Sequence, residues 1–253
     1  MAKKQNPNFN SIQFLSPILL VLYLCLGFIP NLEAVDKIAP QWLGMTLLNL
    51  ASFLTFFLYR EKFSKAISLV LSAFMSLTYI SFILWAGFSY FYAINPTEVL
   101  VNITRQVNVL FMFLAMGILL YGIKQRRAFI SWTITLVLGV EIYAVLAEAL
   151  EMVNTTGFIS SGTLKGVTAN RNITAFSLAI KIPFVLYLVY SLKKESLKIV
   201  LSVLVFFTIL GLSMIQSRAS FIATGLILVS YTILHLYLYI KKERKISHLL
   251  QIG

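Results

Sequence analysis

The sequence predicts an all-α fold, a polytopic transmembrane helix bundle with about eight spans, and three observations point to this class. Hydrophobic residues make up 59% of the 253 residues, and charged residues only 12%. The mean hydropathy of +0.86 is far above that of soluble proteins. Apolar runs of about 20 residues, enough for one bilayer crossing, alternate with short charged connections. We therefore expect a multi-pass membrane protein whose residues 1–253 form a single transmembrane domain.

Each expected span is an apolar run bounded by polar or charged residues. The first run is longer than the core of a signal peptide, and Phe28-Ile29-Pro30 lacks a small-x-small cleavage pattern, so we interpret this run as an uncleaved anchor. The third run is longer than the hydrocarbon requires and ends in aromatic residues, which is typical of a tilted helix. The expected spans cover residues 12–30, 41–59, 66–92, 104–122, 128–150, 172–192, 197–215 and 219–240.

Basic residues are distributed unevenly between the two sides that alternating spans define. Of the 21 lysines and arginines, 15 fall on the side of the N-terminus, five on the opposite side and Lys181 within a span. The positive-inside rule therefore places both termini in the cytoplasm. The formal net charge of +12 reports this orientation and does not indicate nucleic-acid binding. The cytoplasmic set is Lys3, Lys4, Arg60, Lys62, Lys65, Lys124, Arg126, Arg127, Lys193, Lys194, Lys198, Lys241, Lys242, Arg244 and Lys245.

Five basic residues fall on the outer side: Lys37, Arg105, Lys165, Arg171 and Arg218. Arg105 opens the fourth expected span, Arg171 precedes the sixth and Arg218 opens the eighth. Each of these arginines would lie beside a helix N-terminus, whose dipole also favours an anion. Together they would suit a lipid-linked phosphate or diphosphate at the outer leaflet. For any one of them, snorkelling to the lipid headgroups is the alternative.

Two charged residues are expected within the membrane. Glu141 and Lys181 lie at similar depths in the fifth and sixth spans, so they would meet if these spans pack side by side. A buried structural ion pair is one interpretation. The other is a proton or ion relay, with Glu148 two helical turns from Glu141 on the same face. Glu148 would alternatively orient one of the outer arginines, and Pro183 suggests a local kink in the sixth span.

The chain shows no metal-ligand spacing, phosphate loop, nucleotide fingerprint or nucleophile elbow, so we expect neither a metal nor a cofactor. Both histidines, His235 and His248, are expected on the cytoplasmic side. The single cysteine, Cys25, excludes an intrachain disulfide.

Two motifs on the expected outer side resemble those of the O-antigen ligase and polymerase family of bacterial envelope proteins. In that family an Asn-rich motif, commonly Asn-Pro-Asn followed by a small residue, precedes one span, and a Ser-Arg-Gly/Ala motif opens a later one. Here the first motif reads Asn170-Arg171-Asn172, with arginine in place of proline and with Ala175 following. The second is intact as Ser217-Arg218-Ala219.

This resemblance implies a metal-independent glycosyltransferase in the bacterial inner membrane, involved in cell-surface polysaccharide or lipopolysaccharide assembly. It would transfer a glycan from an undecaprenyl diphosphate carrier, at the outer face, to a lipid A core sugar, a protein or another glycan. By this analogy Arg218 contacts the carrier diphosphate. The expected diphosphate-binding residues are Arg218, Arg171, Arg105 and Ser217, and those of the substrate cavity are Asn170, Asn172, Lys165 and Glu148.

The ligases of this family also use a further arginine and a histidine from a large outer loop. These lie beyond the region that the sequence covers, so the catalytic residues stay unassigned. We expect the chain to correspond to the N-terminal two thirds of such a protein, either truncated before the catalytic loop or divergent. The alternative function is a polytopic transporter or a non-catalytic membrane scaffold, in which Glu141, Lys181 and Glu148 line a path.

Overall fold

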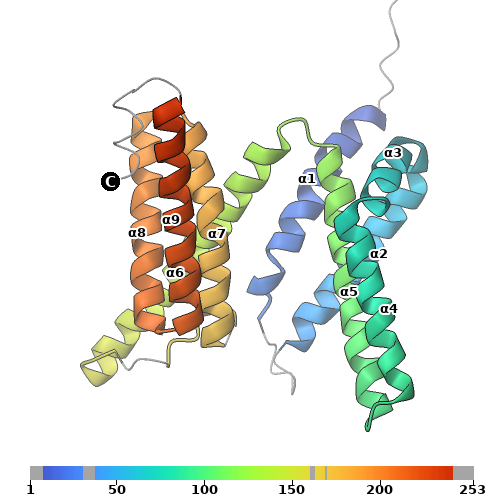
Figure 1. Ribbon diagram of the computed structural model, residues 1–253, viewed down its shortest axis with the longest axis horizontal. Helices are drawn as coiled ribbons and strands as arrows, with labels where there is room; N and C mark the ends of the chain where they lie inside the picture. The colour runs from blue at the N-terminus through green and yellow to red at the C-terminus, as the bar shows by residue number, and fades with distance from the viewer. Residues whose placement is uncertain (1–7, 31–37, 160–162, 169, 242–253) are drawn as a thin grey trace, which may run out of the picture. The chain divides into compact units, whose positions relative to one another are not determined.

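The computed structural model describes residues 8–30, 38–159, 163–168 and 170–241, and most of these residues are helical (Figure 1). No strand occurs among them, which confirms the predicted all-α class. The chain divides into two compact units, Met1–Arg126 and Arg127–Gly253.

The first unit is built around one long helix, α5, against which the other four helices of the unit pack. α2 runs parallel to α5, since Trp42 lies against Arg105 and Asn49 against Asn108. α4 runs antiparallel to α5, since Tyr79 contacts Phe113 while Gly87 lies near Ile103. The elements are α1 (Asn8–Leu24), η1 (Leu26–Phe28), α2 (Ala39–Leu58), α3 (Arg60–Leu71), α4 (Phe74–Phe88), η2 (Ser89–Phe91) and α5 (Pro96–Tyr121).

A chain of side-chain hydrogen bonds joins α1, α2 and α5. The Tyr23 hydroxyl donates to Asn49 Oδ1 (2.9 Å) and lies 3.0 Å from the Ser52 hydroxyl. Asn49 Nδ2 donates to the backbone carbonyl oxygen of Asn108 (2.9 Å), and Asn108 Nδ2 donates to Thr46 Oγ1 (3.0 Å). These bonds fix the three helices in register within a largely apolar unit.

The segment expected as one continuous span over residues 66–92 is divided between two helices. α3 ends at Leu71, and α4 begins at Phe74. Between them the backbone of Ala73 is extended (φ −65°, ψ 138°), which interrupts the helical hydrogen bonding. The apolar part of the expected span that can cross a membrane is therefore Phe74–Phe91.

α3 is an amphipathic helix rather than the start of a span. Its apolar residues recur at the i, i+3, i+4 and i+7 positions of one face, and this face packs against α2 and α5. Hydropathy alone does not reveal the break, because these residues continue directly into the apolar run of α4. The residues of this face are Phe63, Ala66, Ile67 and Val70.

The second unit is a bundle in which α6 and α8 run in one direction and α7 and α9 in the other (Figure 1). α7 packs closely against both α8 and α9, and α6 contributes to the same apolar core. The core centres on fully buried residues such as Val145, Leu178, Ile182 and Leu212. The elements are α6 (Arg126–Thr156), η3 (Gly166–Thr168), α7 (Arg171–Ser191), α8 (Glu195–Ile215) and α9 (Arg218–Lys241).

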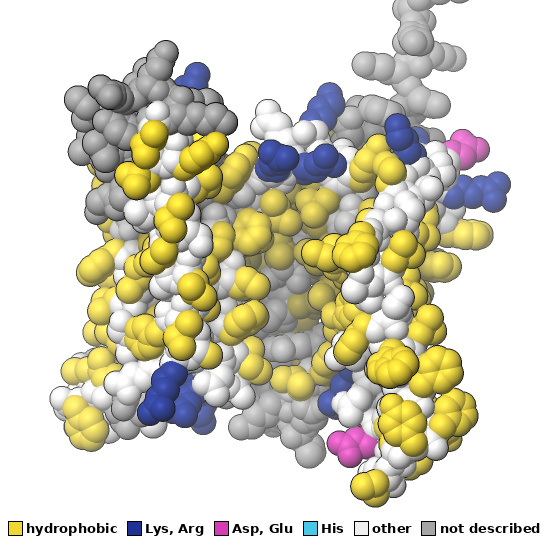
Figure 2. Space-filling model, in the orientation of Figure 1, with side chains coloured by type: hydrophobic (Ala, Val, Ile, Leu, Met, Phe, Trp, Pro, Cys, Tyr) yellow, Lys and Arg dark blue, Asp and Glu magenta, His cyan; other side chains and the backbone are white. Residues whose placement is uncertain are grey.

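Seven of the described helices are long and apolar enough to cross a membrane, and the chain is therefore a multi-pass membrane protein. The first expected span, residues 12–30, corresponds to a shorter apolar helix, Phe14–Leu24, followed by the η1 turn. Within each unit, hydrophobic side chains cover the middle of the visible face, and lysines and arginines gather near the ends (Figure 2). The seven long helices are Ala39–Leu58, Phe74–Phe91, Pro96–Tyr121, Arg126–Thr156, Arg171–Ser191, Glu195–Ile215 and Arg218–Leu238.

Candidate functional site

Arg171 is the first residue of α7, and its side chain is exposed. The residue before it, Asn170, caps the helix, since its Oδ1 accepts hydrogen bonds from the backbone amides of Asn172 (3.0 Å) and Ile173 (3.4 Å). Asparagine is among the preferred N-cap residues because its side chain replaces a missing helical acceptor. The Asn-rich motif therefore forms the start of a helix and presents the arginine at its positive end.

Arg218 occupies the equivalent position in α9. α8 ends at Ile215, and the next residue, Gln216, adopts the left-handed conformation (φ 55°) and allows a tight turn. Ser217 follows and is buried, with its carbonyl oxygen accepting from the Phe221 amide (3.1 Å) and its Oγ from the Ser220 hydroxyl (3.2 Å). Arg218 is then the first helical residue and is exposed.

The two arginines lie at nearly the same level of the second unit. α7 and α9 are parallel neighbours, and the rings of Tyr190 and His235 pack edge to face with centroids 5.1 Å apart. Arg171 precedes Tyr190 by 19 residues, and Arg218 precedes His235 by 17. Neither guanidinium group forms a hydrogen bond or an ion pair with any residue that the structure describes. Two solvated cations therefore mark the same end of this helix pair.

The loop before α7 is held by Glu148 of α6. The half-buried Glu148 carboxylate accepts hydrogen bonds from the backbone amides of Lys165 (3.0 and 3.1 Å) and Gly166 (2.7 Å). The sequence offered Glu148 as a residue that orients an outer arginine, and the bonds that its oxygens form among the described residues are to this backbone. Both N–H groups lie at the start of the η3 turn, where no earlier helical turn supplies a carbonyl acceptor. A carboxylate is a strong acceptor for such amides.

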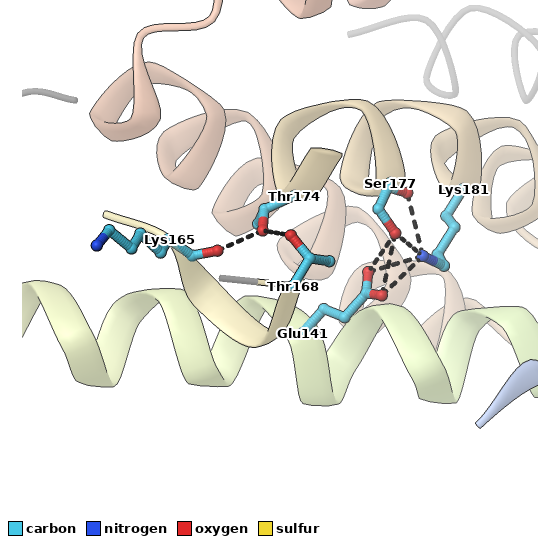
Figure 3. A network of polar contacts seen from close by, with 6 residues as sticks. All are labelled: Glu141, Lys165, Thr168, Thr174, Ser177 and Lys181. Carbon is cyan, nitrogen blue, oxygen red and sulfur yellow. Dashed lines mark hydrogen bonds and ion pairs between the residues drawn. The ribbon is translucent and has the colours of Figure 1, made fainter. Parts of the chain in front are cut away.

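Thr174 ties the same loop to α7. Its hydroxyl donates to the carbonyl oxygen of Lys165 and lies 2.7 Å from the Thr168 hydroxyl (Figure 3). The ammonium group of Lys165 points away from this network. Of the expected cavity residues, Glu148 and Asn170 therefore bind backbone amides, while the side chains of Lys165 and Asn172 are exposed.

Glu141 and Lys181 form a buried ion pair between α6 and α7 (Figure 3). Lys181 Nζ lies 2.9 and 2.8 Å from the two carboxylate oxygens of Glu141. The Ser177 hydroxyl donates to the same oxygens (3.1 and 3.3 Å) and also accepts from Lys181 Nζ. Lys181 completes its bonding with the Ser177 carbonyl oxygen (3.2 Å). α7 remains helical through Pro183, just after this cluster.

Arg105 belongs to the first unit and does not lie at a helix N-terminus, contrary to the expectation. α5 begins at Pro96, well before residue 104, because Asn95 caps the helix by accepting from the Glu98 amide (3.3 Å) and proline is favoured at the first position. Arg105 is therefore inside α5, with its guanidinium carbon 5.9 Å from the centre of the Trp42 ring. Both side chains line a cavity of about 460 Å³ between α2 and α5.

An apolar groove between α7 and α9 was not apparent from the sequence. Its volume is about 460 Å³, and its walls include Tyr187, Tyr190, Tyr231 and His235. His235 is fully buried, with its ring 4.2 Å from that of Tyr231. The signal for this groove is the spacing of aromatic residues three or four apart on both helices, which only the pairing of α7 with α9 brings together.

Several expected features lie outside the described residues. They include Lys37, predicted on the outer side, and His248, predicted on the cytoplasmic side. They also include Lys3, Lys4, Lys242, Arg244 and Lys245, on which the predicted cytoplasmic location of the termini partly depends. Within the described part of the chain, no group of three or more His, Cys, Asp or Glu side chains is arranged to hold a metal ion.

Comparison with protein-family models, curated proteins and solved structures finds no match for this chain. The resemblance to the O-antigen ligase and polymerase family therefore rests on the two motifs that begin α7 and α9.

Proposed function

We propose that this protein binds the diphosphate of an undecaprenyl-diphosphate-linked glycan at the outer face of a bacterial inner membrane, as an O-antigen ligase-like component of surface polysaccharide assembly. The observation that carries the proposal is the matched position of Arg171 and Arg218. Each is the first residue of a long helix, both lie at one end of the same helix pair, and both are exposed without a partner among the described residues. Helix N-termini and guanidinium groups both favour a phosphate anion.

The groove between α7 and α9 supports a lipid-linked substrate. Leu226, the first residue of α9 that lines the groove, follows Arg218 by eight residues, which is about 12 Å along a helix. A prenyl chain whose diphosphate lies at the arginines would reach this groove by following the two helices into the membrane. The groove walls are apolar and aromatic, which suits hydrocarbon.

The transfer of the glycan to an acceptor is supported by the family resemblance alone. The acceptor hydroxyl would lose its proton as it attacks the anomeric carbon, and the carrier diphosphate would leave. Glu148 binds the loop that precedes α7, and its oxygens are engaged by two backbone amides. The geometry therefore supports carrier binding more directly than catalysis. Arg105 belongs to the other unit and is not part of this proposal, so its role in diphosphate binding stays a prediction from the sequence.

The test is binding of a fluorescent undecaprenyl diphosphate analogue to the purified protein in nanodiscs. A charge-assisted hydrogen bond contributes about 1.5–3 kcal/mol, so Arg218→Ala and Arg171→Ala should each weaken binding about tenfold or more. Arg126→Ala is the matched control, since Arg126 is also exposed at the start of a helix but at the opposite end of the bundle. Unchanged binding by Arg218→Ala, or an equal loss in Arg126→Ala, would overturn the proposal.

The alternative function, a transporter with a charged path, is less well supported by the Glu141 cluster. Each carboxylate oxygen of Glu141 accepts from both Lys181 and Ser177, and the pair is almost fully buried. A relay needs a group that exchanges protons with water, whereas this pair is neutralised within the protein. The geometry favours a structural role for Glu141 and Lys181.

A further inference from the structure

A second apolar groove lies in the first unit, between α2, α3 and α5. Its volume is about 370 Å³, within the range of small-molecule sites. Three phenylalanines of α2, Phe53, Phe56 and Phe57, form one wall, and Phe111 of α5 contributes to the other. Phe53, Phe57 and Phe111 are more than half exposed, so the groove is open to the surrounding membrane.

The polar groups at the inner end of this groove are already satisfied by the protein. Ser52 lies 3.0 Å from the Tyr23 hydroxyl, and Asn49 binds both Tyr23 and Asn108. These groups do not require polar atoms from an occupant. The inner end of the groove therefore accepts hydrocarbon.

Arg60 is the one ionisable residue among those that line the groove. It is exposed, it is the first residue of α3, and it has no hydrogen bond or ion pair with the described residues. Lys62 and Lys65 follow it in the first two turns of α3, with Glu61 as the single acidic neighbour. The mouth of the groove is therefore positively charged, and its interior is apolar.

The length of the groove matches one leaflet of a bilayer. Asn49, at the inner end, lies nine residues before the end of α2 at Leu58, about 14 Å at 1.5 Å per residue, and Arg60 follows at the start of α3. Half of the hydrocarbon thickness is about 15 Å. A lipid tail that enters beside Arg60 would therefore extend to the middle of the membrane within the groove.

We infer that this groove is a binding site for an anionic phospholipid, with one acyl chain between α2, α3 and α5 and the headgroup phosphate against Arg60. A guanidinium group binds a phosphodiester through paired, charge-assisted hydrogen bonds. The positive end of α3 adds a smaller contribution of the same sign. A zwitterionic lipid would bring a cation to the basic end of α3, which carries Arg60, Lys62 and Lys65, so the site should discriminate between headgroups of different net charge.

The experiment is native mass spectrometry of the purified protein mixed with equal amounts of phosphatidylglycerol and phosphatidylcholine that carry identical acyl chains. The wild-type protein should retain phosphatidylglycerol in preference to phosphatidylcholine. Arg60→Gln should reduce retention of phosphatidylglycerol about tenfold and abolish the preference. Leu71→Trp, at a half-exposed position of the groove wall, should lower the retention of both lipids by occupying the space for the acyl chain.

Arg127→Gln is the matched control, because Arg127 is exposed and lies outside the groove. Phosphatidylglycerol should also raise the unfolding midpoint of the wild-type protein and of Arg127→Gln, but not that of Arg60→Gln, which separates loss of the site from loss of the fold. A retained preference in Arg60→Gln, an equal loss in Arg127→Gln, or undiminished retention in Leu71→Trp would each overturn the inference. Retention of undecaprenyl phosphate that Arg60→Gln lowers and Arg218→Ala leaves unchanged would also overturn it, and would identify the occupant of this groove as the carrier. The proposed function is independent of these outcomes, since it rests on Arg171 and Arg218.

Discussion

Glu141 and Lys181 face each other across α6 and α7, with the ammonium nitrogen 2.8 and 2.9 Å from the two carboxylate oxygens. Their side chains are only 10% and 15% exposed. A charge in such surroundings is costly unless its partner remains, and the desolvation of both groups offsets much of their attraction. The pair therefore contributes little net free energy of folding, but the loss of either charge alone is costly because the other stays buried without a counter-charge.

Removal of one partner should be far more damaging than removal of both. Glu141→Gln leaves the Lys181 ammonium without a counter-charge, so we expect a loss of about 3–5 kcal/mol in the free energy of unfolding. The double variant Glu141→Leu with Lys181→Leu should recover much of this loss, because no uncompensated charge remains. Unfolding in detergent, followed by circular dichroism, measures all three proteins.

The pair Glu195–Lys198 at the start of α8 is the control for this prediction, because its carboxylate faces solvent. Its atoms are also 2.8 Å apart, and the Lys198 side chain is 14% exposed, but the Glu195 side chain is 77% exposed. Glu195→Gln should therefore cost less than about 1 kcal/mol. Equal losses in the free energy of unfolding for Glu141→Gln and Glu195→Gln would contradict the prediction that burial makes the loss of Glu141 more costly.

Glu148 should control the loop that precedes α7. Glu148→Ala removes the acceptor for the Lys165 and Gly166 amides, and each charge-assisted bond contributes about 1.5–3 kcal/mol. Hydrogen exchange of these two amides should accelerate about tenfold or more, as measured by mass spectrometry of the peptide that contains them. Glu151→Ala, an exposed neighbour on α6, should leave the exchange unchanged. Similar exchange in the two variants would contradict the role of Glu148.

Asn49 should stabilise the first unit through its bonds to α1 and α5. Asn49→Ala leaves the Tyr23 hydroxyl with Ser52 alone and removes the donor to the Asn108 carbonyl, so we expect a loss of about 1–3 kcal/mol. Asn102→Ala, at an exposed position of α5, should change stability by less than about 0.5 kcal/mol. The comparison of thermal unfolding midpoints in one detergent tests this difference, and indistinguishable midpoints would refute it.

Most of the fold was predictable from hydropathy, because a membrane span must be long, apolar and helical. The division at Ala73 was not, since α3 carries its apolar residues at helical spacing and these merge with the run of α4. The early start of α5 at Pro96 was also missed, because the polar first turns of a helix do not contribute to an apolar run. Its signal was the Asn95-Pro96 pair, a cap residue followed by proline.

The predictable part of the candidate site was the part set by depth along a helix. The Glu141–Lys181 pair could be predicted because counting residues from the span ends gives the two side chains the same depth. The same counting places Arg171 and Arg218 at one end of their helices. The partners of Glu148 could not be predicted, because nearly every residue carries a backbone N–H and the sequence does not show which of them lack a partner in the fold. The grooves were hidden for a similar reason, since they depend on which helices become neighbours.

Gly166 should tolerate substitution less well than Gly157, although both have positive φ values of 55° and 78°. A Cβ at Gly166 would lie 2.9 Å from Thr174 Cγ2 and 3.0 Å from Val145 Cγ2, two β-branched side chains that cannot easily move, whereas a Cβ at Gly157 meets nothing within 4 Å. Gly157→Ala should therefore cost only the left-handed backbone strain, about 1–2 kcal/mol. Gly166→Ala should lose about 1–3 kcal/mol more, because the overlap displaces the loop from Glu148 and Thr174. Thermal unfolding of both variants measures the difference, and equal losses would mean that the loop does not pack against α6 and α7 as described.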